Sequence, residues 1–333
     1  MRMSIFKAGR MFLYRMLAAL LLIAGGAQAD PVRLIFAGDI MLDDGSGRAI
    51  AAGRDPLAHF AAILAKADFT VGNLECPVAT GGQPLENKVF SFRAHPGTLS
   101  ILKGRFSALA VSNNHSGDYG KEAFLETLAL LEKNGIPYFG GGRNLAAAHA
   151  PLWIERKGLR IAVLGYNEFK PRSFEAGADW PGIAWSEDSQ VIADIRAARA
   201  AGANLVIPFM HWGWERELQP TERQRQLART MIDAGADMVI GGHPHVTQGA
   251  EYYRGKLIVY SLGNFVFDGF EPPEIPETRL GWLLRLSVSH HGLVAWNTVA
   301  AQMDEEGTPH PVPGALTPCG KAGEAAVRLC KNQ

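Results

Sequence analysis

The chain has 333 residues, of which 47% are hydrophobic, and its 33 basic and 33 acidic residues give a formal net charge of zero. This length and composition are typical of a globular protein with a sizeable core. The balanced charge, without a basic patch interleaved with aromatic residues, argues against nucleic-acid binding and against attachment to an anionic membrane surface.

The first 29 residues have the features of a secretory signal peptide. Four basic residues flank the start of an apolar stretch at 16–24, and Ala27-Gln28-Ala29 fits a small-x-small cleavage site before Asp30. The apolar stretch is shorter than the ~20 residues that a membrane-spanning helix needs, so we favour cleavage over a retained anchor. The sequence therefore predicts export across the inner membrane, to a periplasm.

Apolar strands alternate with helical segments through the rest of the chain. Strands are predicted at 32–37, 69–71, 106–111, 159–165, 204–210, 238–240, 257–260, 283–289 and 293–299, and helices at 57–65, 122–134, 189–201 and 221–234. The last two strands alternate enough to predict an antiparallel pair that closes a sheet. This order predicts an α/β protein, a layered β-sandwich flanked by helices. We expect one domain over residues 30–303 and an irregular tail over 304–333.

Three cysteines are present in a chain that we expect to enter an oxidising compartment. Cys319 and Cys330 lie close together in the tail and can pair, the alternative being two free thiols in a loose segment. We expect Cys76 to be a small buried residue. The sequence has no Cys-x-x-Cys, which excludes a zinc ribbon or a thioredoxin motif.

Side chains with ligand atoms follow five of the predicted strands, at the point where each strand ends. They are Asp39; Asn73 and Glu75; Asn113, Asn114 and His115, with Asp118 three residues on; His211 and Glu215; and His243 and His245. Ligands bind at the carboxyl ends of strands in open α/β sheets, so we expect these side chains to meet. A mixture of carboxylate, amide and imidazole suits manganese, zinc or iron better than calcium. The set is large enough for one or two divalent ions.

Other catalytic classes have less support in the sequence. It contains no Gly-x-Ser-x-Gly nucleophile elbow, no Gly-x-x-x-x-Gly-Lys-Ser/Thr phosphate loop and no Gly-x-Gly-x-x-Gly at the end of a strand. Two divalent ions roughly 3.5–4 Å apart would instead favour an in-line displacement at phosphorus.

Seven motifs, in order over residues 33–268, resemble the CapA family, a branch of the calcineurin-like metallophosphoesterases. They are Gly38-Asp39-Ile40-Met41-Leu42, Gly72-Asn73-Leu74-Glu75, Phe92-Arg93-Ala94, Asn113-Asn114-His115, His211-Trp212-Gly213-x-Glu215, Gly242-His243-Pro244-His245-Val246 and Tyr260-Ser261-Leu262-Gly263-Asn264-Phe265. The resemblance implies a metallo-dependent phosphatase-like fold. It also implies a place in the synthesis of bacterial capsule or poly-γ-glutamate.

The resemblance implies roles for individual residues. The side chains that would bind a first ion are Asp39 and His245, and those that would bind a second are Asn114, His211 and His243. His115 would lie over the leaving group as an acid or charge stabiliser. The alternative for His115 is a hydrogen bond with the preceding Asn that fixes the loop.

The sequence departs from the metallophosphoesterase pattern at two positions. Met41 stands where a histidine ligand is usual, and Asn73 stands where a bridging aspartate is usual. A neutral amide is a poor bridge between two cations. Glu75, two residues on, faces the same side of the strand and can take over the bridge, with Asn73 orienting it or serving as a weaker ligand. Because Met41 removes a ligand, a site with a single ion stays open as an alternative.

Three further side chains are predicted to support the site. Arg93 can clamp a phosphate or carboxylate, or else form a surface salt bridge. Glu215 can orient His211, or else be a solvated loop charge. Asp118 can support His115.

We therefore expect an exported CapA-like protein whose divalent metal supports phosphoester hydrolysis. Its substrate would be a phosphoester or an anionic polymer, and its partners would belong to the machinery that makes or exports an envelope polymer. Two alternatives stay open: a non-catalytic metal-containing factor that binds or guides an anionic polymer, and a peptidase or amidase acting on γ-glutamyl bonds.

Overall fold

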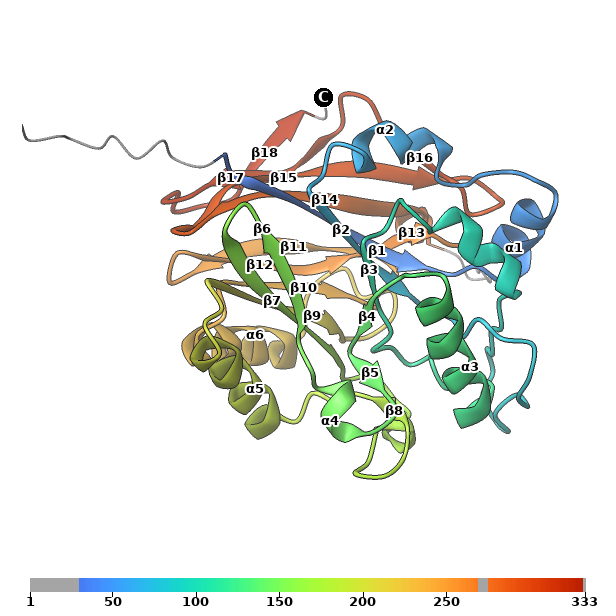
Figure 1. The fold of residues 1–333 in the computed structure, drawn as a ribbon. Helices are drawn as coiled ribbons and strands as arrows, with labels where there is room; N and C mark the ends of the chain where they lie inside the picture. The colour runs from blue at the N-terminus through green and yellow to red at the C-terminus, as the bar shows by residue number, and fades with distance from the viewer. Residues whose placement is uncertain (1–29, 269–274, 332–333) are drawn as a thin grey trace, which may run out of the picture.

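The computed structural model describes residues 30–268 and 275–331 (Figure 1). The predicted signal peptide lies outside these residues. No helix in the described ranges is long and apolar enough to cross a membrane.

The larger of two packed sheets has ten strands within the described residues, in the order β18-β17-β15-β14-β1-β2-β3-β4, with β13 beside β1 and β16 beside β15. The strands are β1 (Val32–Ile40), β2 (Phe69–Leu74), β3 (Ala108–Ala110), β4 (Tyr138–Phe139), β13 (Asn264–Val266), β14 (Leu280–Ser289), β15 (Gly292–Met303), β16 (Pro309–Pro311), β17 (Leu316–Lys321) and β18 (Arg328–Lys331). Strands β1 to β4 run parallel. The predicted antiparallel pair is confirmed as β14 and β15.

The smaller sheet has the strand order β11-β12-β10-β9-β7-β6. Its strands are β6 (Leu152–Arg156), β7 (Leu159–Asn167), β9 (Leu205–His211), β10 (Met238–Gly242), β11 (Thr247–Tyr253) and β12 (Lys256–Leu262). The four central strands run parallel, and β6 and β11 are antiparallel edges. A separate short pair joins β5 (Gly141–Gly142) to β8 (Gly182–Ile183).

The two sheets face each other across an apolar core. Phe36 and Val71 of the larger sheet lie in one buried cluster with Ile161, Ile207 and Ile240 of the smaller sheet. Continuous apolar strands bury both of their faces only when a second layer covers the outer side. Helices supply that layer, so the predicted α/β class with a helix-flanked β-sandwich is confirmed.

Helices cover the outer face of each sheet (Figure 1). They are α1 (Asp44–Ala51), α2 (Ala61–Leu64), α3 (Gly120–Lys133), α4 (Leu145–Ala148), α5 (Asp188–Ala200) and α6 (Glu222–Ala234), with 3-10 turns at η1 (Ala58–Phe60), η2 (Pro96–Ile101), η3 (Arg172–Phe174) and η4 (Pro276–Arg279). Helix α6 begins at the predicted position because Thr221 and Gln224 form a capping box. The helix predicted at 57–65 is instead η1 followed by the single turn of α2.

The prediction of an irregular tail after residue 303 is wrong. Strands β16, β17 and β18 extend the larger sheet, and a disulfide joins Cys319 to Cys330. The glycines that suggested disorder lie in the turns between these strands, where Gly314 and Gly323 have φ of 75° and 79°. The tail is therefore the outer part of the sheet, and the predicted disulfide is confirmed.

We predict that Cys330→Ser lowers the free energy of unfolding by about 2–3 kcal/mol, because the disulfide closes a loop of 11 residues in the unfolded chain. Denaturant unfolding of the oxidised protein and of the variant measures this difference. Reducing the wild type should reproduce it. An unchanged free energy would show that the β17–β18 hairpin is held by its backbone pairing alone.

Asp68 connects the two sheets at the amino end of β2. Its carboxylate accepts hydrogen bonds from the backbone N–H of Arg33 on β1, at 2.8 Å, and from Nζ of Lys157 in the turn between β6 and β7, at 2.9 Å. Burial acts to raise the pKa of Asp68, but these donors outweigh it and lower the pKa to about 2. The ionised form therefore stabilises the fold.

We expect Asp68→Asn to lower the free energy of unfolding by about 1 kcal/mol at pH 7. Because the pKa of Asp68 is lowered by folding, its contribution is complete above the ordinary carboxyl pKa and is lost as the pH falls toward 2. Urea unfolding at pH 7, 5, 4 and 3 should show the two proteins converging below about pH 4. A difference that stays constant with pH would contradict this assignment.

Candidate metal centre

The predicted ligand residues meet where the carboxyl ends of parallel strands from both sheets come together. Asp39 on β1 pairs in register with Asn73 on β2, and His211 at the end of β9 pairs with Gly242 on β10. Glu75 follows β2 directly. The larger sheet thus contributes the carboxylates and the smaller sheet the imidazoles.

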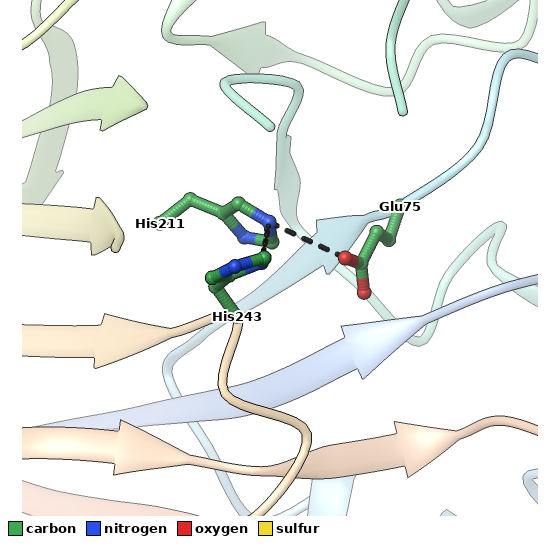
Figure 2. A group of neighbouring side chains, drawn as sticks. All are labelled: Glu75, His211 and His243. Carbon is green, nitrogen blue, oxygen red and sulfur yellow. Dashed lines mark hydrogen bonds and ion pairs between the residues drawn. The ribbon is translucent and has the colours of Figure 1, made fainter. Parts of the chain in front are cut away.

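One group of ligand atoms is centred on Nε2 of His211. This nitrogen lies 3.1 Å from Nδ1 of His243 and 3.3 Å from Oε1 of Glu75 (Figure 2). It also lies 2.6 Å from Oδ1 of Asn114. Ligand atoms that share one ion at 2.0–2.2 Å are separated by roughly 3 Å. The spacing fits a single divalent cation held by one carboxylate, one amide oxygen and two imidazoles.

A second, looser group contains Asp39, Glu75 and His245, each with a ligand atom within 4.8 Å of the others. Nδ1 of His245 is 3.7 Å from Oδ2 of Asp39, and its Nε2 is 4.0 Å from Oε1 of Glu75. Met41 is fully buried in the apolar cluster of the larger sheet, and its sulfur accepts the backbone N–H of Asp43 at 3.1 Å. The looser group thus has fewer ligands than the group around His211.

Glu75 belongs to both groups and is the most constrained residue of the centre. Its side chain is fully buried, and neither carboxylate oxygen has a hydrogen-bond partner within the described residues. Nε2 of His243 likewise has no hydrogen-bond partner within the described residues. A buried carboxylate without hydrogen bonds is costly, and a cation is the partner that removes the cost. The donor set therefore fits a divalent metal.

The ionisation of these groups follows from their burial. Burial, reinforced by the neighbouring Asp39 carboxylate, raises the pKa of Glu75 well above its ordinary value. Burial lowers the pKa of both His211 and His243 well below the ordinary value of imidazole. Both histidines are consequently neutral, which is the form that binds metals.

Asn73 is fully engaged in orienting its neighbours. Its Nδ2 donates to Oδ1 of Asp39 at 2.8 Å and lies 3.2 Å from Nδ1 of His211, while its Oδ1 accepts from Nδ2 of Asn113 at 3.0 Å. Asn73 therefore ties a ligand of one group to a ligand of the other. Asn73 therefore orients Asp39 and His211 rather than Glu75, whose carboxylate oxygens have no hydrogen-bond partner among the described residues, while Glu75 occupies the position between the two groups.

The turn that carries His243 and His245 is held in an unusual backbone conformation. Both residues have positive φ, 94° and 57°, a region that side chains other than glycine rarely adopt. The backbone N–H of His243 donates to Oδ2 of Asp39 at 3.3 Å. A Cβ on Gly242 would lie 3.0 Å from Oδ1 of Asp39, so the approach of this turn to Asp39 requires glycine. Such strain is characteristic of functional sites.

Asn264 is a site residue to which the sequence assigned no role. Its Oδ1 lies 2.9 Å from Nδ1 of His245, and its Nδ2 donates to the backbone carbonyl of Thr278 at 3.0 Å. An acceptor at Nδ1 leaves Nε2 of His245 facing Glu75 as the ligand atom. The sequence contains a signal for this residue, because Asn264 lies in the last of the seven motifs.

His115 lies next to the group around His211 and is held by a buried ion-pair network. Its Nδ1 is 2.8 Å from Oδ2 of Asp118, as predicted for Asp118. Nζ of Lys88 donates to the backbone carbonyl of Asn114 at 2.7 Å and also contacts Asp118. Burial lowers the pKa of His115, although Asp118 acts to raise it. Lys88 comes from the loop between β2 and η2, and no motif pointed to it.

Arg93 lies away from the ligand groups, whereas Glu215 is an exposed charge beside them. The guanidinium of Arg93 donates to the carbonyl of Gly81 at 3.1 Å, stacks 4.3 Å from the ring centre of Tyr119, and lines a separate cavity of about 650 Å³. Glu215 is exposed and lies near His243 and His245, within 4.8 Å, as a third candidate ligand group. Cys76 is buried, as predicted, and its sulfur accepts the backbone N–H of Leu42.

This geometry defines an α/β protein with a buried candidate metal centre at the joined strand ends of two packed sheets. A family model described as "Bacterial capsule synthesis protein PGA_cap" matches residues 33–269. The chain belongs to this family, which confirms the resemblance found in the sequence.

Two curated relatives agree with this assignment. The chain is 34% identical to the PGA biosynthesis protein CapA of Bacillus subtilis, over 72% of this chain and 64% of the relative. It is 30% identical to the capsule biosynthesis protein CapA of Bacillus anthracis, over 78% of this chain and 63% of the relative. The chain thus spans just under two thirds of the length of these relatives.

Among solved structures, the chain is similar to the NAD nucleotidase NadN of Haemophilus influenzae. The TM-score is 0.48 and the sequence identity 13%, over 86% of this chain and 54% of that one.

We predict that Glu75→Gln abolishes metal binding, because it removes the one carboxylate that both ligand groups share. Elemental analysis should find metal in the wild type and in the control Glu132→Gln, which makes the same change on the exposed surface. Metal at 100 times its Kd should stabilise the wild type by about 2.7 kcal/mol and leave Glu75→Gln unchanged. Equal metal content in the wild type and in Glu75→Gln would remove Glu75 from the centre.

Proposed function

We propose that this protein is an exported metal-dependent hydrolase that cleaves a phosphoester in the synthesis of capsule or poly-γ-glutamate. The observation that carries the proposal is the position of Glu75, a buried carboxylate that is common to two ligand groups and has no hydrogen-bond partner in the described part of the chain. The names of the curated relatives, which refer to PGA and capsule biosynthesis, support the polymer context. The predicted signal peptide supports export.

Divalent metal held by these residues supplies a Lewis acid and lowers the pKa of water at the site. The chain supplies the placement of charge. Glu75 balances positive charge between the two groups, Asn73 fixes the direction of Asp39, and Asn264 fixes that of His245. Neutral His211 and His243 add ligand atoms without adding repulsion to bound cations.

His115 is the proton donor of the proposed reaction. Asp118 occupies its Nδ1, which leaves Nε2 to exchange a proton with a leaving oxygen. Burial favours the neutral ring, but an anionic phosphoester beside it favours the protonated ring and so raises the pKa when substrate binds. Lys88 keeps this pair in place by binding Asp118 and the carbonyl of Asn114.

The wide spacing of the ligand atoms in one group favours a second candidate function. In that function the protein binds an anionic polymer in a metal-dependent way and does not hydrolyse it. Asp39 and His245 are 3.7 Å apart at their nearest ligand atoms, and Met41 adds no ligand to this group. If this group stays empty, one ion remains around His211. A centre with one ion can hold the fold and a ligand without hydrolysing it.

We predict that His115→Ala lowers kcat for p-nitrophenyl phosphate esters by about 10²–10⁴-fold while metal content stays unchanged. The matched control is His149→Ala, because His149 forms a buried pair with Asp194, also at 2.8 Å, away from the metal centre. The assay uses protein loaded with manganese and measures release of p-nitrophenol.

The outcomes of this assay separate the candidate functions. Ester cleavage that depends on both metal and His115 supports the hydrolase. Full metal loading with no cleavage of ester or polymer supports the binding factor. Metal-dependent shortening of poly-γ-glutamate without ester cleavage would replace the phosphoesterase by an amidase. If His243→Ala and His245→Ala keep the metal content of the wild type, the centre itself is wrongly assigned.

A further inference from the structure

A second cavity, of about 450 Å³, lies on the outer face of the larger sheet, between α2 and the β17–β18 hairpin. Its lining contains five cationic side chains and no acidic one. These are Arg33, Lys66, Arg285, Lys321 and Arg328. None of its lining residues belongs to the ligand groups of the metal centre. The chain as a whole has a net charge of zero, so this excess of positive charge is a local feature of the cavity.

The strand register places the charged residues of the sheet in two neighbouring rows on one face. In the first row Arg33 pairs with Ser287, Ser287 with Ala295, and Ala295 with Lys321. Paired residues on adjacent strands point to the same face, and strands are ~4.8 Å apart. Arg33 and Lys321, three strands apart, are therefore about 14 Å from each other across the sheet.

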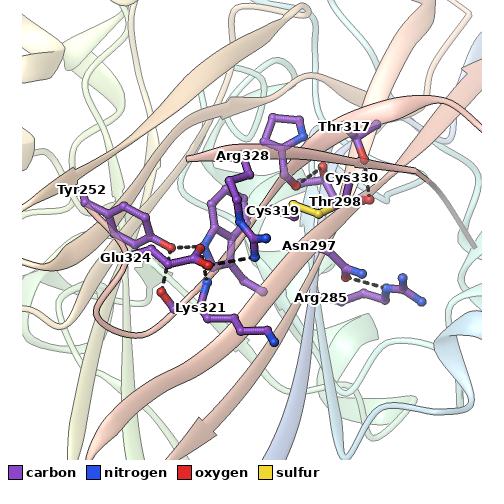
Figure 3. Close-up of a disulfide and its surroundings, with 12 residues drawn as sticks. Tyr252, Arg285, Asn297, Thr298, Thr317, Cys319, Lys321, Glu324, Arg328 and Cys330 are labelled. Carbon is purple, nitrogen blue, oxygen red and sulfur yellow. Dashed lines mark hydrogen bonds and ion pairs between the residues drawn. A yellow bond between two sulfur atoms is a disulfide. The ribbon is translucent and has the colours of Figure 1, made fainter. Parts of the chain in front are cut away.

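The second row contains Arg285 and ends at Arg328. Arg285 pairs with Asn297, Asn297 with Cys319, and Cys319 with Arg328. The disulfide between Cys319 and Cys330 fixes the hairpin that carries Arg328 and Lys321 (Figure 3). The positive charges are thus spread over the strands that line the cavity. This arrangement suits a ligand with several separated negative charges.

Arg285 lies in the lining of this cavity and has no carboxylate partner among residues 30–268 and 275–331. Its Nε donates to Oδ1 of Asn297 at 2.8 Å, and burial alone lowers its pKa. Lys66 and Lys321 also have no ion pair with another described residue. Arg328 pairs with Glu324 at 2.8 Å, and Arg33 with Asp68 at 3.4 Å, but both guanidinium groups are more than half exposed and stay open to a further anion. A partly buried guanidinium without a paired anion carries an uncompensated positive charge. An anionic ligand that binds there compensates this charge.

We propose that this cavity binds a segment of a polycarboxylate chain, such as poly-γ-glutamate, separately from the metal centre. The anionic character of the ligand follows from the lining. The choice of a polymer follows from the spread of the charges over about 14 Å, since a single phosphate or carboxylate cannot extend from Arg33 to Lys321. The choice of polyglutamate rests on the proposed function. Binding here holds the polymer on the protein and does not require that the metal centre turn over.

The test measures the affinity of the full chain for poly-γ-glutamate oligomers of defined length by calorimetry. The double variant Arg285→Gln/Lys321→Gln should bind about tenfold more weakly at low salt. The control Lys133→Gln/Arg143→Gln removes the same charge from the exposed surface near α3 and should bind within twofold of the wild type. The affinity of the wild type should fall as salt rises.

Lys66→Gln/Lys321→Gln, which changes two exposed side chains, provides the same test if loss of Arg285 impairs folding. Equal oligomer affinity in the wild type and in both cavity variants would overturn the proposal. Displacement of the oligomer by inorganic phosphate at an equal concentration of negative charge would also overturn it, in favour of a small-anion site. Metal content and ester cleavage are measured on the same samples, so a failure of the hydrolase is distinguished from a failure of this site.

Discussion

The packing of the two sheets decides where each candidate ligand lies. Strands β1 and β2 of one sheet and β9 and β10 of the other end at the same border of the sandwich, so Asp39 and Glu75 face His211 and His243 across the line where the sheets meet. The apolar cluster that contains Phe36 and Ile207 fixes this relation. Close-packed interiors resist small displacements, so the packing of the core keeps the residues of the centre in fixed positions.

The same packing creates the electrostatic cost that makes the centre receptive to metal. The exclusion of water leaves the Glu75 carboxylate without solvent and, among the residues that the structure describes, without a hydrogen-bond partner. The protein avoids part of this cost by raising the pKa of Glu75 and lowering that of His211. Metal binding would replace this neutralisation by direct coordination, which couples metal affinity to pH and to folding. The hydrogen bonds of Asn73 and Asn264 are already arranged for that state.

Much of the fold and of the centre is predictable from the sequence, for identifiable reasons. Buried strands such as β9 and β10 read as continuous apolar runs, and their polar ends mark the border where His211 and His243 lie. The hairpin β17–β18 was missed because its strands are short and because Pro318 and Gly320 within β17, with Gly323 in the turn, suggested an irregular segment. Lys88 was missed because its loop has no periodicity. The basic cavity was missed because Arg33, Lys66 and Arg285 are far apart in sequence and meet only through the sheet register.

Strand β1 has a consequence for the order of folding. Although it is the first strand of the described chain, it lies inside the larger sheet, between β2 and β14, and Val32 pairs with Val288. Closing a loop of about 250 residues carries an entropic cost that only the completed sheet repays. The N-terminal strand therefore cannot be paired on both of its sides until almost the whole chain has been made. Such a delay is compatible with the proposed export, because translocation through a membrane pore requires an unfolded polypeptide.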